Sequence, residues 1–532
     1  MNILTKKEDK KLLWIVIIIF IFAFFIFRPY FMQERGLLYG GDDEGYFAHA
    51  TSLVFFQFPD YSKEFYTDAG TGAPPTADNY PMHSIGPALM SFPFVFTFSL
   101  IDRIQGSSIV EKRDVSNIID SWTLFGFVLS TIFYFYVGIL LLYKALRNYF
   151  DDIICLYSIL FMILFQYFFL YVFRRPVLSH IYEFFLQSIL VYFFIKDSKT
   201  KFINNTKLWF AILIGVLIGL IILVRNNNIL FAVLWPVVLF CFENNRFSIK
   251  KGWKKLLISY SIGIIIVFIF KFVLLLIYKY EAYGYVVKNI MGRSNLFDKA
   301  NLFFLFKSFL NVIFGIDFGI IFTAPFILLG IFCLFFLKFD IKKKLLIIFF
   351  PIMLNIFFAL GLKGWYGYRY FVFSITPLLL FPLAQFFNSL KEKKILKKWL
   401  IVFFILSILP IASMVVFEGN STNLTLHLKE QYFGLTDWGN KFYQVEIWKT
   451  LFLNPSEIFK AVFKGGPLYL VYLIAQIFHL NKFLPAIVLE KYSVFNIKIL
   501  IKTIIIYIFP FILYLIYPLS IRIKSKKLSK IT

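Results

Sequence analysis

The densest acidic cluster of this chain lies in the stretch GGDDEGYFAHA, where Asp42, Asp43 and Glu44 follow one another. Nothing basic flanks them closely, although the chain has a formal net charge of +25. A carboxylate in such a place can act as a general base and take the proton of an attacking hydroxyl group. Three carboxylates could instead hold Mg²⁺, but consecutive residues of a helix do not face one another. We therefore predict proton transfer without a metal or cofactor, with Mg²⁺ as the alternative.

Cationic residues that could oppose these acids recur in later connections between apolar segments. They are Arg174 and Arg175 in RRPVLSH, Arg225 in RNNN, and Lys363 and Arg369 in LKGWYGYRY. A guanidinium group presents a planar fork that matches phosphate oxygens. A base beside an acceptor hydroxyl, with cations on a leaving phosphate, would suit an inverting displacement of a sugar from a lipid phosphate.

The composition defines which elements must position these residues. The chain has 532 residues, is 60% hydrophobic and only 16% charged, and has a mean hydropathy of +0.76. Repeated apolar runs of about 20 residues are each long enough to cross a bilayer as a helix. The sequence therefore predicts an all-α polytopic membrane protein.

The positive charge does not indicate a nucleic-acid partner. Lys and Arg form short clusters between apolar runs, without a repeated basic and aromatic pattern. Cys155, Cys241 and Cys333 lie inside apolar runs, which predicts neither a disulfide framework nor a zinc site. Membrane lipids are the partners that this composition favours.

Hydropathy predicts about twelve transmembrane helices, with ends located to within a few residues. They cover residues 12–32, 117–143, 153–173, 177–195, 208–224, 229–243, 256–278, 319–337, 345–361, 371–388, 400–417 and 498–519. The first run follows a cluster of lysines, as in a signal peptide. However, it is long and continues into FRPY without a small-residue cleavage site, so we predict that it is retained.

Every second connection between these runs is short and basic, as in KDSKTKFINNTK, SLKEKKILKKW and the tail IRIKSKKLSK. The positive-inside rule then places both termini in the cytoplasm and the acidic cluster on the outer face of a cytoplasmic (inner) membrane, which we take to be bacterial. Residues 85–101 and 465–480 could pass for spans, but counting either one would reverse the later basic clusters. We predict an interfacial helix at 85–101 and an interfacial or re-entrant segment at 465–480.

Four quoted segments resemble motifs of membrane glycosyltransferases of the GT-C superfamily. DDEGYFAHATSL is similar to the Asp-Glu motif of their first outer loop, and NYPMHSIGPALMSFPFV to the segment that leads into their juxtamembrane helix. GWYGYRYFVFSITPLL resembles their late outer-loop motif, and FGIDFGIIFTAPFILLG a glycine-rich stretch that enters a later span. The resemblance covers most of the chain up to about residue 420. It rests on the order of the motifs and is nearest to family 39 protein mannosyltransferases, aminoarabinose transferases and Rgt-type enzymes.

The resemblance implies a GT-C fold, a lipid-linked sugar donor and a glycan or protein acceptor. It aligns Asp43 with the catalytic carboxylate, Glu44 with its neighbour, and Arg369 with an arginine that holds the lipid-linked phosphate. Asp42 adds a second aspartate, so either aspartate could be the base. RRPVLSH departs from the Arg-Pro-Asp often found at that turn. The implied modules are a catalytic module at 1–417 with its outer loop at 33–116, an outer segment at 418–497, and a last span with a basic tail at 498–532.

Several of these residues also have simpler interpretations. Asp42 and Asp43 could cap a helix, because acids favour a helix N-terminus. Arg174 and Arg175 could anchor lipid headgroups, and Arg225 could suit the C-terminal end of a span. The possible substrate contacts are Tyr46, His83, His180, Arg225 and Tyr368. Of these, His180 on an apolar helix is more often a packed and hydrogen-bonded residue than a ligand, and His83 has no evident partner.

Two rival functions differ in where they need charged residues. A lipid-linked oligosaccharide flippase or transporter would need ionisable groups along its spans, where Lys271 and Glu183 are the main ones. A polysaccharide polymerase or ligase would concentrate arginines in large late outer loops. The acidic motif in the first loop favours a glycosyltransferase.

Overall fold

The computed structural model describes most of the chain up to residue 278 and parts of the remainder. The described residues are 6–26, 41–64, 83–166, 168–200, 208–243, 246–278, 310, 313–314, 320, 324–335, 344–349, 351–352, 369–402, 405, 452–453, 455–456, 470–471, 474–475, 478–480 and 497–528.

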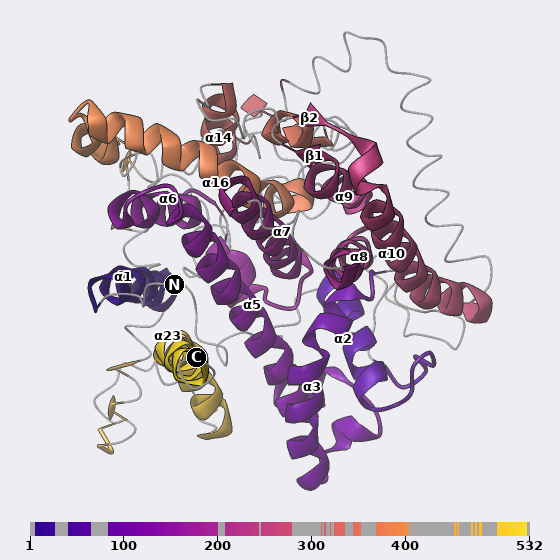
Figure 1. Ribbon diagram of the computed structural model, residues 1–532. Helices are drawn as coiled ribbons and strands as arrows, with labels where there is room; N and C mark the ends of the chain where they lie inside the picture. The colour runs from indigo at the N-terminus through magenta and orange to yellow at the C-terminus, as the bar shows by residue number, and fades with distance from the viewer. Residues whose placement is uncertain are drawn as a thin grey trace.

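These residues are almost entirely helical (Figure 1). The elements are α1 Lys6–Ile26, α2 Gly41–Val54, α3 Gly86–Ile104, η2 Ser108–Val110, α4 Val115–Ile119, α5 Trp122–Leu146, α6 Asp152–Leu164, η3 Leu170–Arg174, α7 His180–Thr200, α8 Leu208–Val224, η4 Asn226–Asn228, α9 Ile229–Phe240, β1 Phe242–Glu243, β2 Arg246–Phe247, α10 Ile249–Tyr278, α14 Pro325–Phe335, α16 Arg369–Glu392 and α23 Ile497–Leu528. The two-residue strands β1 and β2 pair antiparallel and are a small exception to the all-α prediction.

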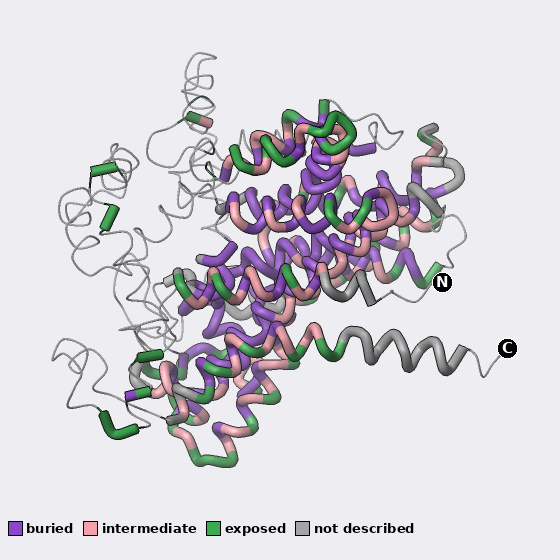
Figure 2. Tube along the Cα trace, turned by 90° about the vertical axis from the view of Figure 1, so that its left-hand side faces the viewer, coloured by how far each residue is buried: buried purple, intermediate pink, exposed green. Residues whose placement is uncertain are grey.

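Helix α5 lies at the centre of the described bundle. It packs against α3, α7 and α23, and most of its side chains are buried. Figure 2 shows buried residues through the middle of the helices and exposed residues on their outer faces. Gly138 of α5 brings α7 close, because a Cβ added there would lie 2.8 Å from the ring of Phe184. This layer holds the segment between α6 and α7 in place.

The start of α5 differs from the predicted span at 117–143. The short helix α4 ends at Ile119, and α5 begins anew at Trp122. Asp102 of α3 caps this second start, accepting from the backbone N–H groups of Trp122 and Thr123 at 3.1 and 2.7 Å. The N–H groups at a helix N-terminus need acceptors of this kind. The hydropathy prediction ran across this break, although Asp120 and Ser121 stand between α4 and α5.

Helices α8 and α10 form a second closely packed pair. A Cβ added to Gly215 would lie 2.7 Å from Ile262, and one added to Gly263 would lie 2.8 Å from Ile218. Small residues at such contacts let membrane helices gain van der Waals contact. The predicted span at 208–224 is confirmed as a helix with the same bounds.

Four described helices are long and apolar enough to cross a membrane. They are Gly86–Ile104, Trp122–Leu146, Gly252–Lys271 and Val372–Glu392. Further apolar helices of 10–17 residues include Lys11–Phe25, Leu208–Val224 and Ile501–Ile516. The count of twelve spans stays a prediction, because much of 279–368 and 403–496 lies outside the described residues.

Helix α3 corresponds to the predicted interfacial helix at 85–101 and is long enough to be a span. It begins at the C-terminal end of α8, where a Cβ added to Gly86 would lie 2.3–2.6 Å from the backbone of Leu223 and Val224. It then runs antiparallel to the N-terminal half of α5, and the Tyr134 hydroxyl donates to the Met90 carbonyl at 2.8 Å. The start of α3 therefore contacts the C-terminal end of α8, and the rest of α3 follows α5.

The position of α5 along its own axis, relative to the turn between α6 and α7, explains this arrangement. The hydroxyl of Thr131 donates to the Pro176 carbonyl in the turn between α6 and α7 at 2.6 Å. Trp122 lies nine residues earlier, so α5 begins about 14 Å beyond this turn at 1.5 Å per residue. Helix α3 lies along that extension. Because α3 is long and apolar enough to cross a membrane, its interfacial placement and the orientation of the later helices stay predictions.

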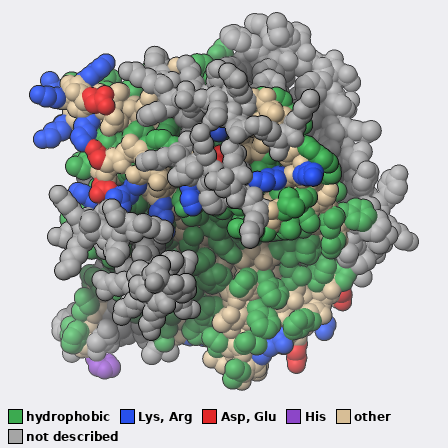
Figure 3. Space-filling view, in the orientation of Figure 1, with side chains coloured by type: hydrophobic (Ala, Val, Ile, Leu, Met, Phe, Trp, Pro, Cys, Tyr) green, Lys and Arg blue, Asp and Glu red, His purple; other side chains and the backbone are tan. Residues whose placement is uncertain are grey.

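One end of the bundle is rich in exposed lysines. Exposed lysines gather at the C-terminal end of α16 and just after it, at positions 391, 393, 394, 397 and 398. Figure 3 shows Lys and Arg side chains at the upper left, over this end of α16, and a broad hydrophobic area elsewhere on this face. Lys391 forms an ion pair with Asp151, which caps α6. This basic end is the predicted cytoplasmic end.

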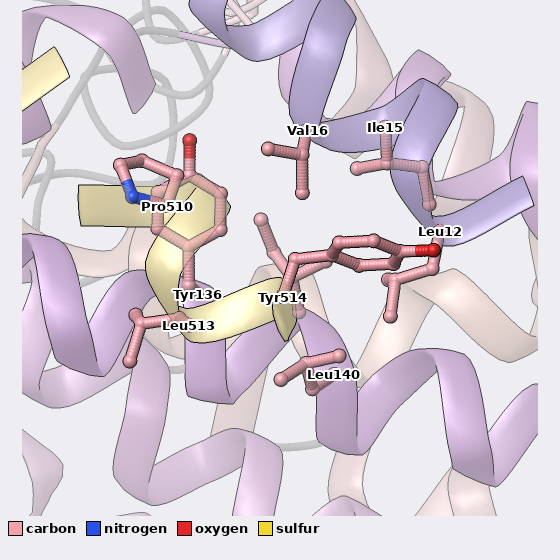
Figure 4. Close-up of a pocket in the computed structure, with 9 residues that line it drawn as sticks. Leu12, Ile15, Val16, Tyr136, Leu140, Pro510, Leu513 and Tyr514 are labelled. Atoms are coloured by element: carbon pink, nitrogen blue, oxygen red, sulfur yellow. The ribbon is translucent and has the colours of Figure 1, made fainter. Parts of the chain in front are cut away.

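The first and last described helices pack against each other, and α23 also packs against α5. Residues of α1, α5 and α23 surround a small cavity, shown in Figure 4 and lined by Leu12, Ile15, Val16, Tyr136, Ile139, Leu140, Pro510, Leu513 and Tyr514. Nearer the start of α23, the buried Lys502 donates to the carbonyls of Asp120 and Ser121, both at 2.7 Å. The middle of α23 therefore packs on α5, and the start of α23 bonds to the residues just before α5.

Candidate functional site

Helix α2 places the acidic cluster against the bundle. It begins at Gly41, so the cluster occupies the first turn, where the positive end of the helix dipole favours acids. Asp43 is completely buried and Glu44 is 5% exposed. Asp43 Oδ2 accepts a hydrogen bond from Arg175 Nη2 at 3.1 Å. The helix predicted from EGYFAHATSLVFF is confirmed, whereas the side chain of Asp42 lies outside the described residues.

The turn between α6 and α7 presents Arg175 to α2. Arg175 directly follows η3, a single π-helical turn, which is a feature that often occurs at functional sites. The Pro176 carbonyl is held by α5, as described above. Ser179, which directly precedes α7, receives a hydrogen bond from the Tyr46 hydroxyl at 3.1 Å. Two contacts therefore join α2 to this turn, one through Asp43 and one through Tyr46.

His83 supports the other side of α2. Its ring lies 5.1 Å from that of Tyr46, and its carbonyl lies 2.8 Å from His49 Nε2. The Nδ1 atom of His49 is also 2.6 Å from the Tyr61 hydroxyl. Gly45 makes the close approach possible, because a Cβ there would lie 2.2 Å from His83 Nδ1. His83, for which the sequence showed no partner, is therefore a packing neighbour of Tyr46.

A second buried acid lies in the first turn of α7, and a second arginine faces it from the end of α8. Glu183 is completely buried, and its Oε2 lies 3.6 Å from Arg225 Nη1. The same Nη1 donates to His180 Nδ1 at 2.8 Å. Arginine has no acceptor, so His180 Nδ1 accepts and the ring proton lies on Nε2. His180 is 2% exposed, which agrees with the prediction of a packed and hydrogen-bonded residue.

The N-terminal end of α16 lies against this second pair. The Phe373 ring stacks on His180 with centroids 5.2 Å apart, and Tyr171 contacts both rings at 5.0 and 4.5 Å. Arg369 is the first residue of α16, one turn before Phe373. The backbone therefore brings Arg369 to the end of the bundle that holds the 174–180 turn. Its side chain lies outside the described residues, as do the side chain of Arg174 and all of Lys363 and Tyr368.

A third buried pair lies within the predicted first outer loop, 33–116. Arg113 Nη2 contacts Glu64 Oε1 at 2.5 Å, and Arg113 Nε contacts Glu64 Oε2 at 3.1 Å. The Thr51 hydroxyl donates to the same carboxylate, and Gln57 accepts from Arg113. Burial raises the pKa of the Glu64 carboxyl, and the adjacent Arg113 opposes this effect. Sequence reasoning missed this pair, because the two residues are 49 positions apart and neither stands in a recognisable motif.

The arrangement can support acid–base chemistry beside a cationic surface. Within the part of the chain that the structure describes, no group of three or more His, Cys, Asp or Glu could hold a metal ion. Asp43 and Glu183 each face an arginine, and both pairs attach to the segment from Arg175 to Glu183. Asp43, Arg175, Tyr46, His180 and Arg225 are thereby linked through contacts at one end of the bundle.

Comparisons with known proteins found little. No protein-family model matches the chain, and no curated protein matches it. It is similar to solved structures of the Archaeoglobus fulgidus oligosaccharyltransferase. The apo form has 13% identity over 86% of this chain and 56% of that chain, with a TM-score of 0.38. The complex with Zn and sulfate has 15% identity over 80% and 58%, with a TM-score of 0.39.

A complex of the same archaeal enzyme, AglB, with an inhibitory peptide and a dolichol-phosphate gives 14% identity over 86% and 56%, with a TM-score of 0.36. The chain thus spans little more than half the length of these solved structures. At TM-scores below 0.5, this likeness carries no inference about the fold or activity of this chain.

Proposed function

We propose that this chain is an integral membrane glycosyltransferase of the GT-C type. It transfers a sugar from a polyprenyl-phosphate carrier to a hydroxyl of an envelope glycolipid, polysaccharide or protein on the outer face of the cytoplasmic membrane. The observation that carries this proposal is the buried Asp43–Arg175 pair, at the end of the bundle opposite the lysine-rich end of α16. The resemblance of its acidic motif to GT-C enzymes adds to that observation.

In the proposed reaction Asp43 is the general base. It takes the proton of the acceptor hydroxyl while the acceptor oxygen forms a bond to the anomeric carbon of the sugar. The bond from that carbon to the phosphate oxygen breaks, and its electron pair leaves with the polyprenyl phosphate. The anomeric configuration inverts. Cations that face the leaving phosphate stabilise its charge most effectively where little water is present.

The proposal gives Arg175 and Arg369 different roles. Arg175 contacts Asp43 directly and therefore orients the base. Arg369 begins the helix packed on His180, and we assign it, with Arg174 and Lys363, to the donor phosphate. Because Asp43 is completely buried, the acceptor can reach it only if the residues that cover it shift when substrates bind. A transporter would instead need charged groups spread along its spans, whereas these pairs gather at one end.

The test uses purified protein in detergent with a panel of polyprenyl-phosphate sugars and envelope acceptors. Asp43→Asn should lower the transfer rate by about 10²–10⁴-fold, the usual contribution of a general base. Asp42→Asn in parallel distinguishes the two aspartates, and Glu64→Gln is the matched control for loss of a buried carboxylate. Transfer at the unaltered rate in Asp43→Asn would contradict the assignment of the base. Transfer from none of the donors by the unaltered protein would contradict the function.

A further inference from the structure

The two main ionisable residues inside the predicted spans, Glu183 and Lys271, both reach one short turn. Glu183 lies 3.6 Å from Arg225, which directly precedes η4. Lys271 Nζ donates to the side-chain oxygen of Asn226, the first residue of η4, at 2.6 Å. The two residues are 88 positions apart and belong to α7 and α10. Their convergence on residues 225–226 is therefore a result of the tertiary fold.

Lys271 ends an exposed apolar stripe on α10. Leu257, Ile264 and Phe268 are 57%, 67% and 56% exposed, and Lys271 is exposed as well. Their spacings of 7, 4 and 3 residues place all four side chains on one face of the helix. The opposite face of α10 packs on α8 through Gly263. An ionisable residue inside a predicted span is a candidate functional residue.

Arg225 presents its charge at the same turn. Its side chain is 10% exposed, whereas that of Glu183 is completely buried. His180 and Glu183 both contact Nη1, so they fix the direction of the guanidinium group from the protein side. Among the described residues, the cations Arg225 and Lys271 and the acid Glu183 therefore converge on this turn.

We propose that the turn at 225–228 binds the phosphate of an isoprenoid lipid. Lys271 and Arg225 contact the phosphate, and the isoprenoid chain lies along the stripe formed by Leu257, Ile264 and Phe268. The charge and the apolar stripe together select a ligand with one anionic group on a long hydrocarbon chain. This inference rests on the proposed function, because it adds Lys271 and Arg225 to the residues assigned to the phosphate of the lipid-linked donor.

The turn is also close to the proposed base. His180, which binds Arg225, follows Ser179, which receives the hydroxyl of Tyr46 on α2. The C-terminal end of α8 also contacts the start of α3 through Gly86. A phosphate at the turn would thus lie beside the element that carries Asp43, on the side of the bundle where α10 is exposed.

The test measures binding of polyprenyl phosphate to the full chain in nanodiscs, with no sugar and no acceptor. Lys271→Gln and Arg225→Gln should each weaken binding about ten- to hundredfold, as for the loss of a hydrogen bond to a charged group. Lys254→Gln is the matched control, because Lys254 is an exposed lysine of the same helix outside this turn. Lys271→Arg and Arg225→Lys should retain part of the affinity, which separates loss of charge from misfolding.

A phospholipid headgroup has the same chemistry, so phosphatidic acid is added as a competitor. Weak competition supports a site for the isoprenoid donor, and equal competition would overturn it in favour of a general phospholipid site. Unchanged binding in the Lys271→Gln/Arg225→Gln double variant would also overturn it. Asp43→Asn should leave binding unchanged, so a failed base and a failed phosphate site give different results.

Discussion

The pairs Asp43–Arg175 and Glu64–Arg113 are both buried carboxylate–guanidinium pairs, and they are built differently. Arg113 reaches both oxygens of Glu64, and Thr51 adds a further bond. That pair lies wholly within the predicted first outer loop. The contact of Asp43 with Arg175 uses one carboxylate oxygen and joins the loop to the helical bundle.

Under the proposed function, the first pair takes part in the reaction and the second stabilises the fold. A buried ion pair offsets its desolvation only when its geometry is good and further hydrogen bonds are made. Glu64–Arg113 meets that condition and holds the loop in shape. Asp43–Arg175 bridges two elements, so a substrate that separates them alters this contact without unfolding either element. We therefore expect changes at Asp43 to act on turnover and changes at Glu64 to act on stability.

The largest expected effect is on turnover in the double variant Asp43→Asn/Arg175→Gln. Removing both charges avoids leaving one buried without a counter-charge, so most of the thermal stability should remain. Transfer should still fall by about 10²–10⁴-fold, because the base is absent. Initial rates and melting temperatures in detergent measure the two properties. Recovery of transfer in the double variant would show that the pair is structural, like Glu64–Arg113.

Next in size is the effect of Arg113→Met on stability. It leaves the Glu64 carboxylate buried without its main partner and should cost about 3–5 kcal/mol. The double variant Arg113→Met/Glu64→Leu should recover much of this loss, because no charge is then buried. Thermal unfolding of the purified protein provides the measurement. Unchanged stability in Arg113→Met would contradict the assignment of Glu64–Arg113 as the stabilising pair.

A smaller effect is expected for Gly45→Ala. The new Cβ would lie 2.2 Å from His83 Nδ1, so the His83 ring must move away from Tyr46. Displacement of α2 from the bundle by about 1 Å can lower turnover by about 10²-fold. Removing the ring in Gly45→Ala/His83→Ala should restore part of the rate. If the double variant is no faster than Gly45→Ala, crowding at this contact does not explain the loss.

The smallest effect concerns pH and the exposed Asp60 in the same loop. Hydrogen bonds from the Ser62 backbone and hydroxyl lower the pKa of the Asp60 carboxyl below 3.8. The contribution of Asp60 to stability is therefore present above pH 3.8 and is lost as the pH falls through its lower folded-state value. Because the group is exposed, the difference between Asp60→Asn and the unaltered protein should be below about 1 kcal/mol at pH 6. An equal difference at pH 6 and pH 2 would contradict this.

The sequence by itself predicted most features that depend on nearby residues. The apolar runs predicted the helices, and the spans at 208–224 and 371–388 correspond to α8 and α16. The acids at the start of α2 were recognised because helix dipoles act within one turn. Clusters of lysine predicted which end of the bundle is basic. Each of these features follows from the local period of the chain or from local charge.

The partners of the charged residues were decided only by the tertiary structure. Asp43 meets Arg175, 132 positions away, while Arg225 meets His180 and Glu183. In the sequence these arginines are alike, because each follows or precedes an apolar run. Which of them faces an acid depends on helix packing, on the axial position of α5 and on the close approaches at Gly45 and Gly86. None of these features leaves a periodic signal in the sequence. Packing between distant segments therefore made the site, whereas the sequence supplied its residues.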